Sequence, residues 1–243
     1  MDTARRNLLI GVGGLSAALI LRDGFTPKML FAGESNSQKE SENNMEMEVT
    51  AVEDLMREHG VLRRLLIVYS ESVGKFRQSP AAAIYEPVNK AAQLFRTFGE
   101  NYHEKALEET FIFPAVAKAG GEASGYINIL IDQHRRGREI TDYILAATKG
   151  KDSVNVKGLT SAMEAFVRMY RSHAAREDTV VFPAWKQTIN QEQLEEMGEK
   201  FEEIEHEQFG KDGFDKAVSQ VAEIEKQLGL SDLSQFTAPA VVI

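Results

Sequence analysis

The chain of 243 residues contains no cysteine. This absence excludes thiolate zinc sites, iron–sulfur clusters and disulfide bonds, so any bound metal ion must be held by nitrogen and oxygen atoms. Proline is also scarce, with six residues in all, and the middle of the chain has few runs of β-branched residues. Long stretches without a helix breaker predict an all-α fold.

Positive charge is in deficit, and the formal net charge is −9. Binding to phosphates depends on clusters of lysine and arginine, so we expect no nucleic-acid partner. The sequence also lacks a glycine-rich phosphate loop, an obvious Ser-His-Asp order and a cofactor-binding motif. The acidic residues are spread along the chain, which is typical of a solvated helical surface.

Residues 1–32 differ in composition from the rest of the chain. Arg5 and Arg6 precede the 14-residue apolar stretch Leu8–Leu21, which is shorter than the ~20 residues that span a bilayer. This order predicts an export signal, and the arginine pair resembles the twin-arginine type. We therefore expect a periplasmic protein; the alternative is an uncleaved signal that anchors it in the inner membrane. Residues 33–48, rich in Ser, Asn and Glu, predict a flexible linker.

Apolar residues recur at spacings of three and four over the remainder of the chain, which predicts five helices. The predicted ranges are Val49–Gln78, Pro87–Ala119, Ala123–Lys149, Val156–Thr188 and Gln191–Leu228, the last interrupted at Gly210–Gly213. Short loops between the first four helices predict an antiparallel four-helix bundle made of two αα-hairpins over residues 49–190. Residues 191–243 are then an additional C-terminal helix and tail.

Two stretches of the chain repeat one another. Tyr102–Pro114 reads YHEKALEETFIFP and Ser172–Pro183 reads SHAAREDTVVFP, and in both the first acid of an acidic pair precedes the proline by six residues. His59 and His134 each lie one predicted helix upstream of a repeat, and an arginine follows each of them four residues later. A histidine and a carboxylate about one helical turn apart can bind a metal ion, so the doubled pattern predicts two ions.

The two copies differ in spacing. Glu177 follows His173 by four residues, so both side chains lie on one face of an α-helix. Glu108 follows His103 by five residues, which turns it about 140° away at ~100° per residue. We predict a single-turn π-bulge within His103–Glu108 that brings both groups inward. In a regular α-helix, Glu104 would instead be the partner of Glu108.

The donor set of imidazoles and carboxylates suits iron, manganese or zinc, and two ions bridged by carboxylates are a known solution in helical bundles. Each histidine should donate its second ring N–H to an outer acceptor. His206 lacks the Phe-Pro context and is predicted to be solvated or to lie just outside the ligands, with ligation as the less favoured alternative. Arg63 and Arg138 are expected in surface ion pairs, with the site carboxylates as alternative partners. The Phe-Pro pairs are expected only to shape helix ends.

These motifs resemble the hemerythrin-like (HHE cation-binding) family over roughly Thr50–Lys186. The resemblance implies a four-helix bundle with an oxo- or hydroxo-bridged non-haem di-iron centre, and manganese or zinc are less favoured. It also implies a set of ligands: histidines His59, His103, His134 and His173, and bridging carboxylates Glu108 and Glu177. Some family members use the acid directly after the second-helix histidine, which makes Glu104 a further candidate.

One departure from the oxygen carriers of this family bears on function. They place another histidine four residues after the third-helix histidine, where this chain has Arg138. The first hypothesis is therefore a protein that binds or senses dioxygen, nitric oxide or iron. The second is a di-iron enzyme, peroxidase- or oxidase-like, that reduces peroxide or nitric oxide, because a missing ligand leaves an open position. The third is a bundle that the metal merely stabilises.

Overall fold

The computed structural model describes residues 49–79, 82–149 and 155–241. The predicted signal sequence and linker lie outside these described residues. Within them the chain is all-α, with no strand, as the sequence predicts. The described helices belong to a compact unit that runs from Val49 onward. No helix among the described residues is both long enough and apolar enough to cross a membrane.

The first helix, α1 (Ala51–Gln78), begins where the sequence predicts. Thr50 caps its N-terminus, where the hydroxyl accepts a hydrogen bond of 3.3 Å from the backbone N–H of Glu53. The second helical segment is continuous and consists of α2 (Ala82–Leu94), the π-helix η1 (Phe95–Ile112) and α3 (Phe113–Ala119). It ends at Gly120, whose φ of 75° favours glycine.

The second segment starts earlier than predicted. Its helix begins at Ala82, whereas the sequence prediction placed the start at Pro87, and the proline lies inside α2. A proline removes only one backbone hydrogen bond, and close to the N-terminus of a helix few turns precede it. The helix therefore continues through this position.

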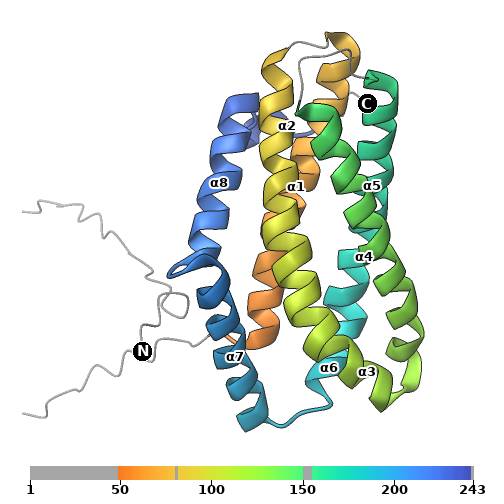
Figure 1. The fold of residues 1–243 in the computed structure, drawn as a ribbon, viewed down its shortest axis with the longest axis vertical. Coiled ribbons are helices and arrows are strands. Elements are labelled where there is room, and N and C mark those ends of the chain that lie inside the picture. Colours follow the sequence, from red (N-terminus) through yellow and green to blue (C-terminus); the bar gives the residue numbers. More distant parts are fainter. Residues whose placement is uncertain (1–48, 80–81, 150–154, 242–243) are drawn as a thin grey trace, which may run out of the picture. The chain divides into compact units, whose positions relative to one another are not determined.

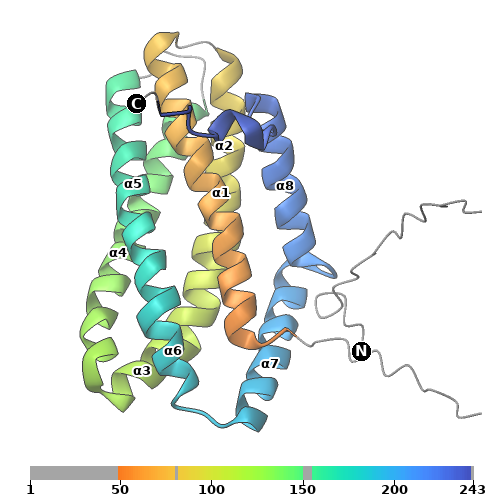
Figure 2. The same ribbon diagram turned by 180° about the vertical axis from the view of Figure 1, so that it is seen from behind.

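The third and fourth segments complete a bundle. They are α4 (Gly121–Thr148) and the run of α5 (Val156–Arg176), the π-helix η2 (Glu177–Val181) and α6 (Phe182–Lys186). Consecutive long segments run in opposite directions along the molecule (Figures 1 and 2). Helix α1 packs against α5, α4 against α5, and α2 against α4. The four faces enclose one apolar core.

The predicted C-terminal helix is present as two helices, α7 (Gln191–Phe209) and α8 (Gly213–Leu228). The break lies within the predicted interruption: Gly210 has a φ of 70° and Asp212 a φ of 64°. Helix α8 packs against α1 and α2, and α7 against α1 and η1 (Figure 1). A short 3-10 turn, η3 (Leu233–Phe236), follows.

Candidate metal centre

The π-helix η1 brings the first histidine–acid pair together. Within η1, Nε2 of His103 lies 3.3 Å from Oε1 of Glu108, although the two residues are five apart in sequence. The prediction that a π-turn aligns this pair is confirmed. Its extent was underestimated, because the structure has a π-helix from Phe95 to Ile112 and not a single widened turn.

The second pair is close by regular helical spacing, as predicted. Nε2 of His173 lies 3.0 Å from Oε1 of Glu177, one α-helical turn away. A second π-helix begins at Glu177, which the sequence analysis did not predict. In both copies the backbone N–H of the phenylalanine bonds to the carbonyl of the acid five residues before it: Phe113 to Glu108 and Phe182 to Glu177.

The prolines explain why both π-turns end at the same place. Pro114 and Pro183 directly follow those phenylalanines, at the start of α3 and α6. A proline inside a helix has no N–H to donate, and its ring clashes with the carbonyl four residues earlier. A wider turn before the proline relieves this clash. The six-residue spacing between acid and proline was therefore the signal for the second π-turn.

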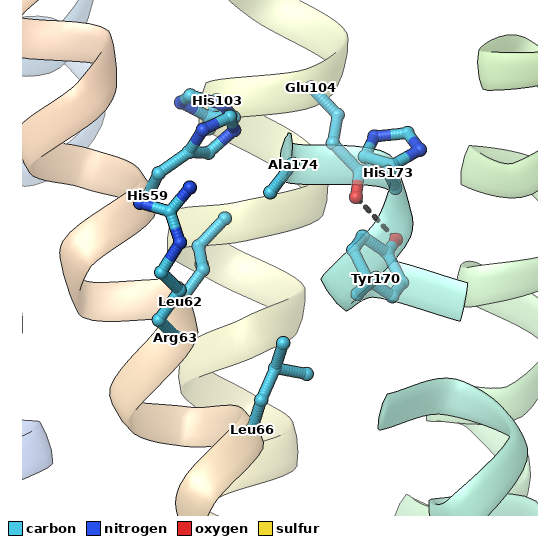
Figure 3. A pocket seen from close by; sticks show the side chains of 9 residues that line it. All are labelled: His59, Leu62, Arg63, Leu66, His103, Glu104, Tyr170, His173 and Ala174. Carbon is cyan, nitrogen blue, oxygen red and sulfur yellow. Dashed lines mark hydrogen bonds between the residues drawn. The ribbon is translucent and has the colours of Figure 1, made fainter. Parts of the chain in front are cut away.

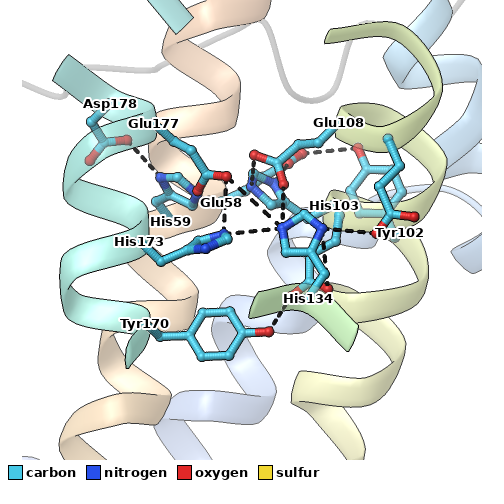
Figure 4. Close-up of polar contacts among 12 residues, drawn as sticks. Glu58, His59, Tyr102, His103, Glu108, His134, Tyr170, His173, Glu177 and Asp178 are labelled. Atoms are coloured by element: carbon cyan, nitrogen blue, oxygen red, sulfur yellow. Dashed lines mark hydrogen bonds and ion pairs between the residues drawn. The ribbon is translucent and has the colours of Figure 1, made fainter. Parts of the chain in front are cut away.

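Four imidazole nitrogens and two carboxylates converge in the middle of the bundle (Figure 4). Glu108 directs Oε1 to His103 and Oε2 to His134, the latter at 3.4 Å from Nε2. Glu177 directs Oε1 to His173 and Oε2 to His59, the latter at 3.5 Å from Nε2. Each carboxylate thus has one oxygen toward each of two half-sites. We call them the His59/His103 half and the His134/His173 half.

Both halves are sealed from solvent. All six of these residues are buried, with at most 3% of the residue exposed. Ligand atoms of Glu108, His134, His173 and Glu177 lie within 4.8 Å of one another, and so do those of His59, His103 and Glu108. None of the four oxygens of Glu108 and Glu177 has a hydrogen-bond partner among the described residues. Buried carboxylates without partners are costly unless a cation or proton compensates them.

Every histidine of the centre is held by an outer acceptor through Nδ1. His59 contacts Asp178 at 2.6 Å and His134 contacts Glu109 at 2.8 Å. His103 contacts Glu58 at 2.6 Å and His173 contacts the amide oxygen of Gln133 at 2.9 Å. Since these oxygens accept, each Nδ1 carries the proton and each Nε2 offers a lone pair to the centre. The expectation of outer acceptors is met at all four rings.

The outer acceptors follow the internal repeat. Asp178 and Glu109 are the second acids of the two acidic pairs, and Glu58 and Gln133 directly precede His59 and His134. Sequence reasoning missed these roles, although their positions next to the ligand candidates were the signal that could have found them. The acceptors also cross between hairpins, because Asp178 on η2 holds His59 of α1, and Glu109 on η1 holds His134 of α4.

The two arginines support these acceptors. Arg63 pairs with Asp178, and Arg138 contacts Glu109 at 2.5 Å and Glu104 at 3.2 Å. Arg138 thus contacts the ligand candidate Glu104, which was the alternative to a surface pair, whereas Arg63, whose side chain is 45% exposed, pairs with Asp178, which was not a ligand candidate. The guanidinium of Arg138 is engaged with these two acids on the Nδ1 side of His134.

The charges of the centre compensate one another in the metal-free chain. Burial alone would lower the pKa of His103, but the facing carboxylates of Glu108 and Glu58 outweigh it and hold this pKa well above its usual value. Burial likewise opposes the charged form of His134, yet the carboxylates of Glu104 and Glu108 raise its pKa well above the usual value. Burial would raise the pKa of Glu177, but His173 and His59 hold it well below the ordinary range.

The phenylalanines of the Phe-Pro pairs do more than shape helix ends. Phe182 stacks on His59 with ring centroids 5.3 Å apart, and Phe113 stacks on His134 at 5.4 Å. The expectation that these pairs serve only the helix ends was therefore too narrow. Each phenylalanine covers one imidazole face and keeps water from the ring.

Glu104 is buried beside the centre but is engaged elsewhere. The hydroxyl of Tyr170 donates to its Oε1 at 2.5 Å (Figure 3). Arg138 contacts Oε2 of Glu104. Its Oε2 lies 3.9 Å from Nδ1 of His134, the proton-bearing nitrogen, and not beside a free Nε2. The remaining histidine, His206, is exposed on α7 and belongs to none of the groups that could hold an ion among the described residues.

A small cavity adjoins the centre between α1 and α5 (Figure 3). Its volume is about 10 Å³, which is roughly the space for one water-sized molecule. His59, His103 and His173 line it on the side of the centre, and Leu62, Leu66 and Ala174 line it toward the core. Tyr170, Glu104 and Arg63 complete the polar wall.

The donor set fits metal ions. Nitrogen and oxygen ligands lie about 2.0–2.2 Å from a first-row ion, which puts neighbouring donors roughly 2.8–3.6 Å apart in octahedral or tetrahedral geometry. The observed N···O distances of 3.0, 3.3, 3.4 and 3.5 Å match this range. Nε2 of His134 and Nε2 of His173 also face each other at 3.1 Å. Two lone pairs at that distance repel unless a cation or a proton lies between them.

The fold and the site define a helical-bundle protein with a buried cluster of histidines and carboxylates that could hold a metal ion. The chain belongs to the hemerythrin HHE cation binding domain family, whose match covers residues 50–185. The resemblance inferred from the motifs is thereby confirmed.

Curated relatives share most of the chain. It is 46% identical over 198 residues to the uncharacterized protein Rv1995 of Mycobacterium tuberculosis (strain ATCC 25618 / H37Rv), which covers 79% of this chain and 75% of the relative. The same values hold for the uncharacterized protein Mb2018 of Mycobacterium bovis (strain ATCC BAA-935 / AF2122/97). No solved structure matches the chain.

Proposed function

We propose that this protein binds two iron ions and takes up a small ligand, dioxygen or nitric oxide, beside them. The observation that carries the proposal is the set of four inward Nε2 atoms around two buried carboxylates whose oxygens have no hydrogen-bond partner among the described residues. The donors are nitrogen and oxygen only, which suits iron better than thiophilic ions. Family membership supports cation binding, and iron is the proposed cation.

Each half-site supplies two histidines, and Glu108 and Glu177 bridge the halves. Iron would supply the redox and ligand-binding chemistry there. The chain's own residues bind the ions, fix the ring orientation through the Nδ1 contacts and exclude water through Phe113 and Phe182. Glu104 is assigned to the surroundings of the centre, because Tyr170 and Arg138 already occupy its oxygens.

The adjoining cavity supports a small ligand. Its volume of about 10 Å³ corresponds to roughly one water-sized molecule, which suits a small ligand. Its wall combines apolar side chains with three histidines that belong to both halves, so a ligand in it lies next to both halves.

The alternative function is a di-iron enzyme that reduces peroxide or nitric oxide. One observation favours it: Tyr170 and Glu104 line the cavity and share a hydrogen bond of 2.5 Å. Burial and the nearby carboxylates of Glu104 and Glu100 raise the pKa of Tyr170 well above its usual value, so the hydroxyl stays protonated. A protonated hydroxyl and a carboxylate beside the ligand provide the proton handling that such reductions require.

The metal content tests the first part of the proposal. We expect two iron ions per chain in the parent protein and in the His206→Ala variant, which removes the exposed histidine on α7. His173→Ala should retain at most one ion, because it removes a donor from one half only. Iron content equal in His173→Ala and His206→Ala would contradict the assignment.

Spectroscopy separates the two functions. A reversible visible band that depends on dioxygen or nitric oxide supports binding. Multiple turnovers of peroxide or nitric oxide support the enzyme, and Tyr170→Phe should then slow turnover while iron content stays at the parent level.

Export completes the proposed function. The twin-arginine pattern at Arg5 and Arg6 supports transport of the folded, metal-loaded protein to the periplasm. Cell fractionation of the parent and an Arg5→Lys/Arg6→Lys variant tests it, with loss of the periplasmic fraction expected in the variant.

A further inference from the structure

The two C-terminal helices lie beyond the matched family range of residues 50–185, yet one of their acids reaches the interior. Glu205 of α7 is 4% exposed. Its Oε1 accepts a hydrogen bond of 3.0 Å from the backbone N–H of Phe214 at the start of α8. Gly213 leaves the necessary space, because a Cβ there would lie 2.7 Å from Cγ of Glu205. The break between α7 and α8 is thus built around this carboxylate.

Glu205 is connected to the metal centre through two further side chains. Its Oε2 lies 3.4 Å from the hydroxyl oxygen of Tyr102. Tyr102 donates to Oε1 of Glu58 at 2.9 Å, and Oε2 of Glu58 accepts from Nδ1 of His103 at 2.6 Å (Figure 4). Tyr102, Glu58 and His103 are at most 1% exposed, so water does not compete for these contacts.

The other half of the centre lacks this support. The corresponding acceptor for His173 is Gln133, a neutral amide that is only half-buried. A carboxylate acceptor makes a histidine a stronger donor to a metal than an amide does, because it stabilises the positive charge that builds on the ring. The two halves have similar ligands but different outer acceptors, a carboxylate for His103 and an amide for His173.

We infer that the α7–α8 hairpin sets the metal affinity of the His59/His103 half, with Tyr102 and Glu205 as positioning residues that act through Glu58. The inference rests on the proposed metal-binding function and adds a role for a region outside the family domain. Glu205, held by the start of α8, is the second and longer acceptor of the Tyr102 hydroxyl, which shares its one proton between Glu58 and Glu205, and so limits where that hydroxyl points. That hydroxyl fixes Glu58, and Glu58 fixes the ring of His103.

The test compares two tyrosines that each lose a buried hydroxyl. Tyr102→Phe removes the hydroxyl that contacts Glu58. Tyr69→Phe is the matched control, because Tyr69 is equally buried and its hydroxyl has no hydrogen-bond partner among the described residues. The metal-free full chain is titrated with Co²⁺, whose visible absorption reports each ion that binds.

We expect Tyr102→Phe to weaken one of the two Co²⁺ ions about tenfold, at the lower end of the 10–100-fold cost of losing an outer partner. The second ion should keep its affinity within about twofold, as should both ions in Tyr69→Phe. Glu205→Ala should act like Tyr102→Phe. Glu205→Gln should lie closer to the parent, because its amide oxygen still accepts from Phe214 and its amide N–H donates to Tyr102.

A second readout needs no metal. Nitrogen NMR of the histidine rings in the metal-free chain should show a shift of the Nδ1 signal of His103 in Tyr102→Phe, with the signal of His134 unchanged. Equal weakening of both ions, or a Tyr102→Phe chain that matches Tyr69→Phe in both readouts, overturns the inference. A parent chain that takes up no Co²⁺ overturns the proposed metal site instead, and the ring signals then still decide whether the hairpin positions His103.

Discussion

Gly137 of α4 should not tolerate even a methyl group. A Cβ at this position would lie 2.9 Å from both Cε2 and Cζ of Tyr170 and closer still to its hydroxyl oxygen. The ring has no free space to move into, because it packs against Phe95 at 4.9 Å and Phe166 at 4.4 Å between centroids, so any shift disturbs this packing. Gly137→Ala therefore displaces Tyr170 and breaks its hydrogen bond to Glu104.

The expected loss of stability follows from three effects. Overpacking costs about 1–3 kcal/mol, and loss of the hydrogen bond to a charged group costs about 1.5–3 kcal/mol. The higher helix propensity of alanine returns about 1 kcal/mol. The net loss of stability is therefore roughly 1.5–5 kcal/mol. Gly125→Ala is the control on the same helix, since nothing lies within 4 Å of its Cβ position. It should gain about 0.5–1 kcal/mol. Urea unfolding of the metal-free proteins measures the stability change in Gly137→Ala and in Gly125→Ala. Equal stability of the two variants would refute the reasoning.

Two further predictions concern the charges of the centre. In the metal-free chain, the pKa values of His103 and His134 are raised, so both residues contribute to the free energy of unfolding. This contribution is complete below pH 6.5 and is lost as the pH rises through the raised pKa values of the folded chain. The lowered pKa of Glu177 contributes stability that is complete above pH 4.5 and is lost as the pH falls through the lowered pKa. Urea unfolding should therefore show maximal stability between pH 4.5 and pH 6.5. Maximal stability at pH 8 would contradict this. Gln133→Glu gives His173 a carboxylate acceptor and should strengthen one ion about tenfold in a Co²⁺ titration; unchanged affinity would contradict the outer-acceptor argument.

The fold was largely predictable from the sequence, because periodic apolar residues and few prolines leave little alternative to long helices. The helix ends at Gln78 and Ala119 and the break after Phe209 matched their local signals. The start at Ala82 did not, since a proline near a helix N-terminus is compatible with several start positions.

The inward-facing side chains of the centre were predictable because a repeated spacing marks them. The residues that orient these side chains could not be predicted from the sequence. Glu58 and Gln133 look like ordinary surface residues of a helix, and only the packing of a neighbouring helix makes them acceptors. Glu205 lies more than one hundred residues from Tyr102, so no local pattern relates them. The stacking of Phe113 and Phe182 likewise depends on contacts between hairpins.

The crossed outer contacts have a consequence for how such a centre can arise. Asp178 in the second hairpin orients His59 in the first, and Glu109 in the first orients His134 in the second. A single hairpin would hold its entry histidine, His59 or His134, without the acid that orients it. Two identical hairpins related by a twofold axis would restore every contact, since each would orient the other's ring. The crossed contacts are what a symmetric homodimer of half-length chains would form before fusion into one polypeptide. After fusion the two copies could diverge, as Glu58 and Gln133 have.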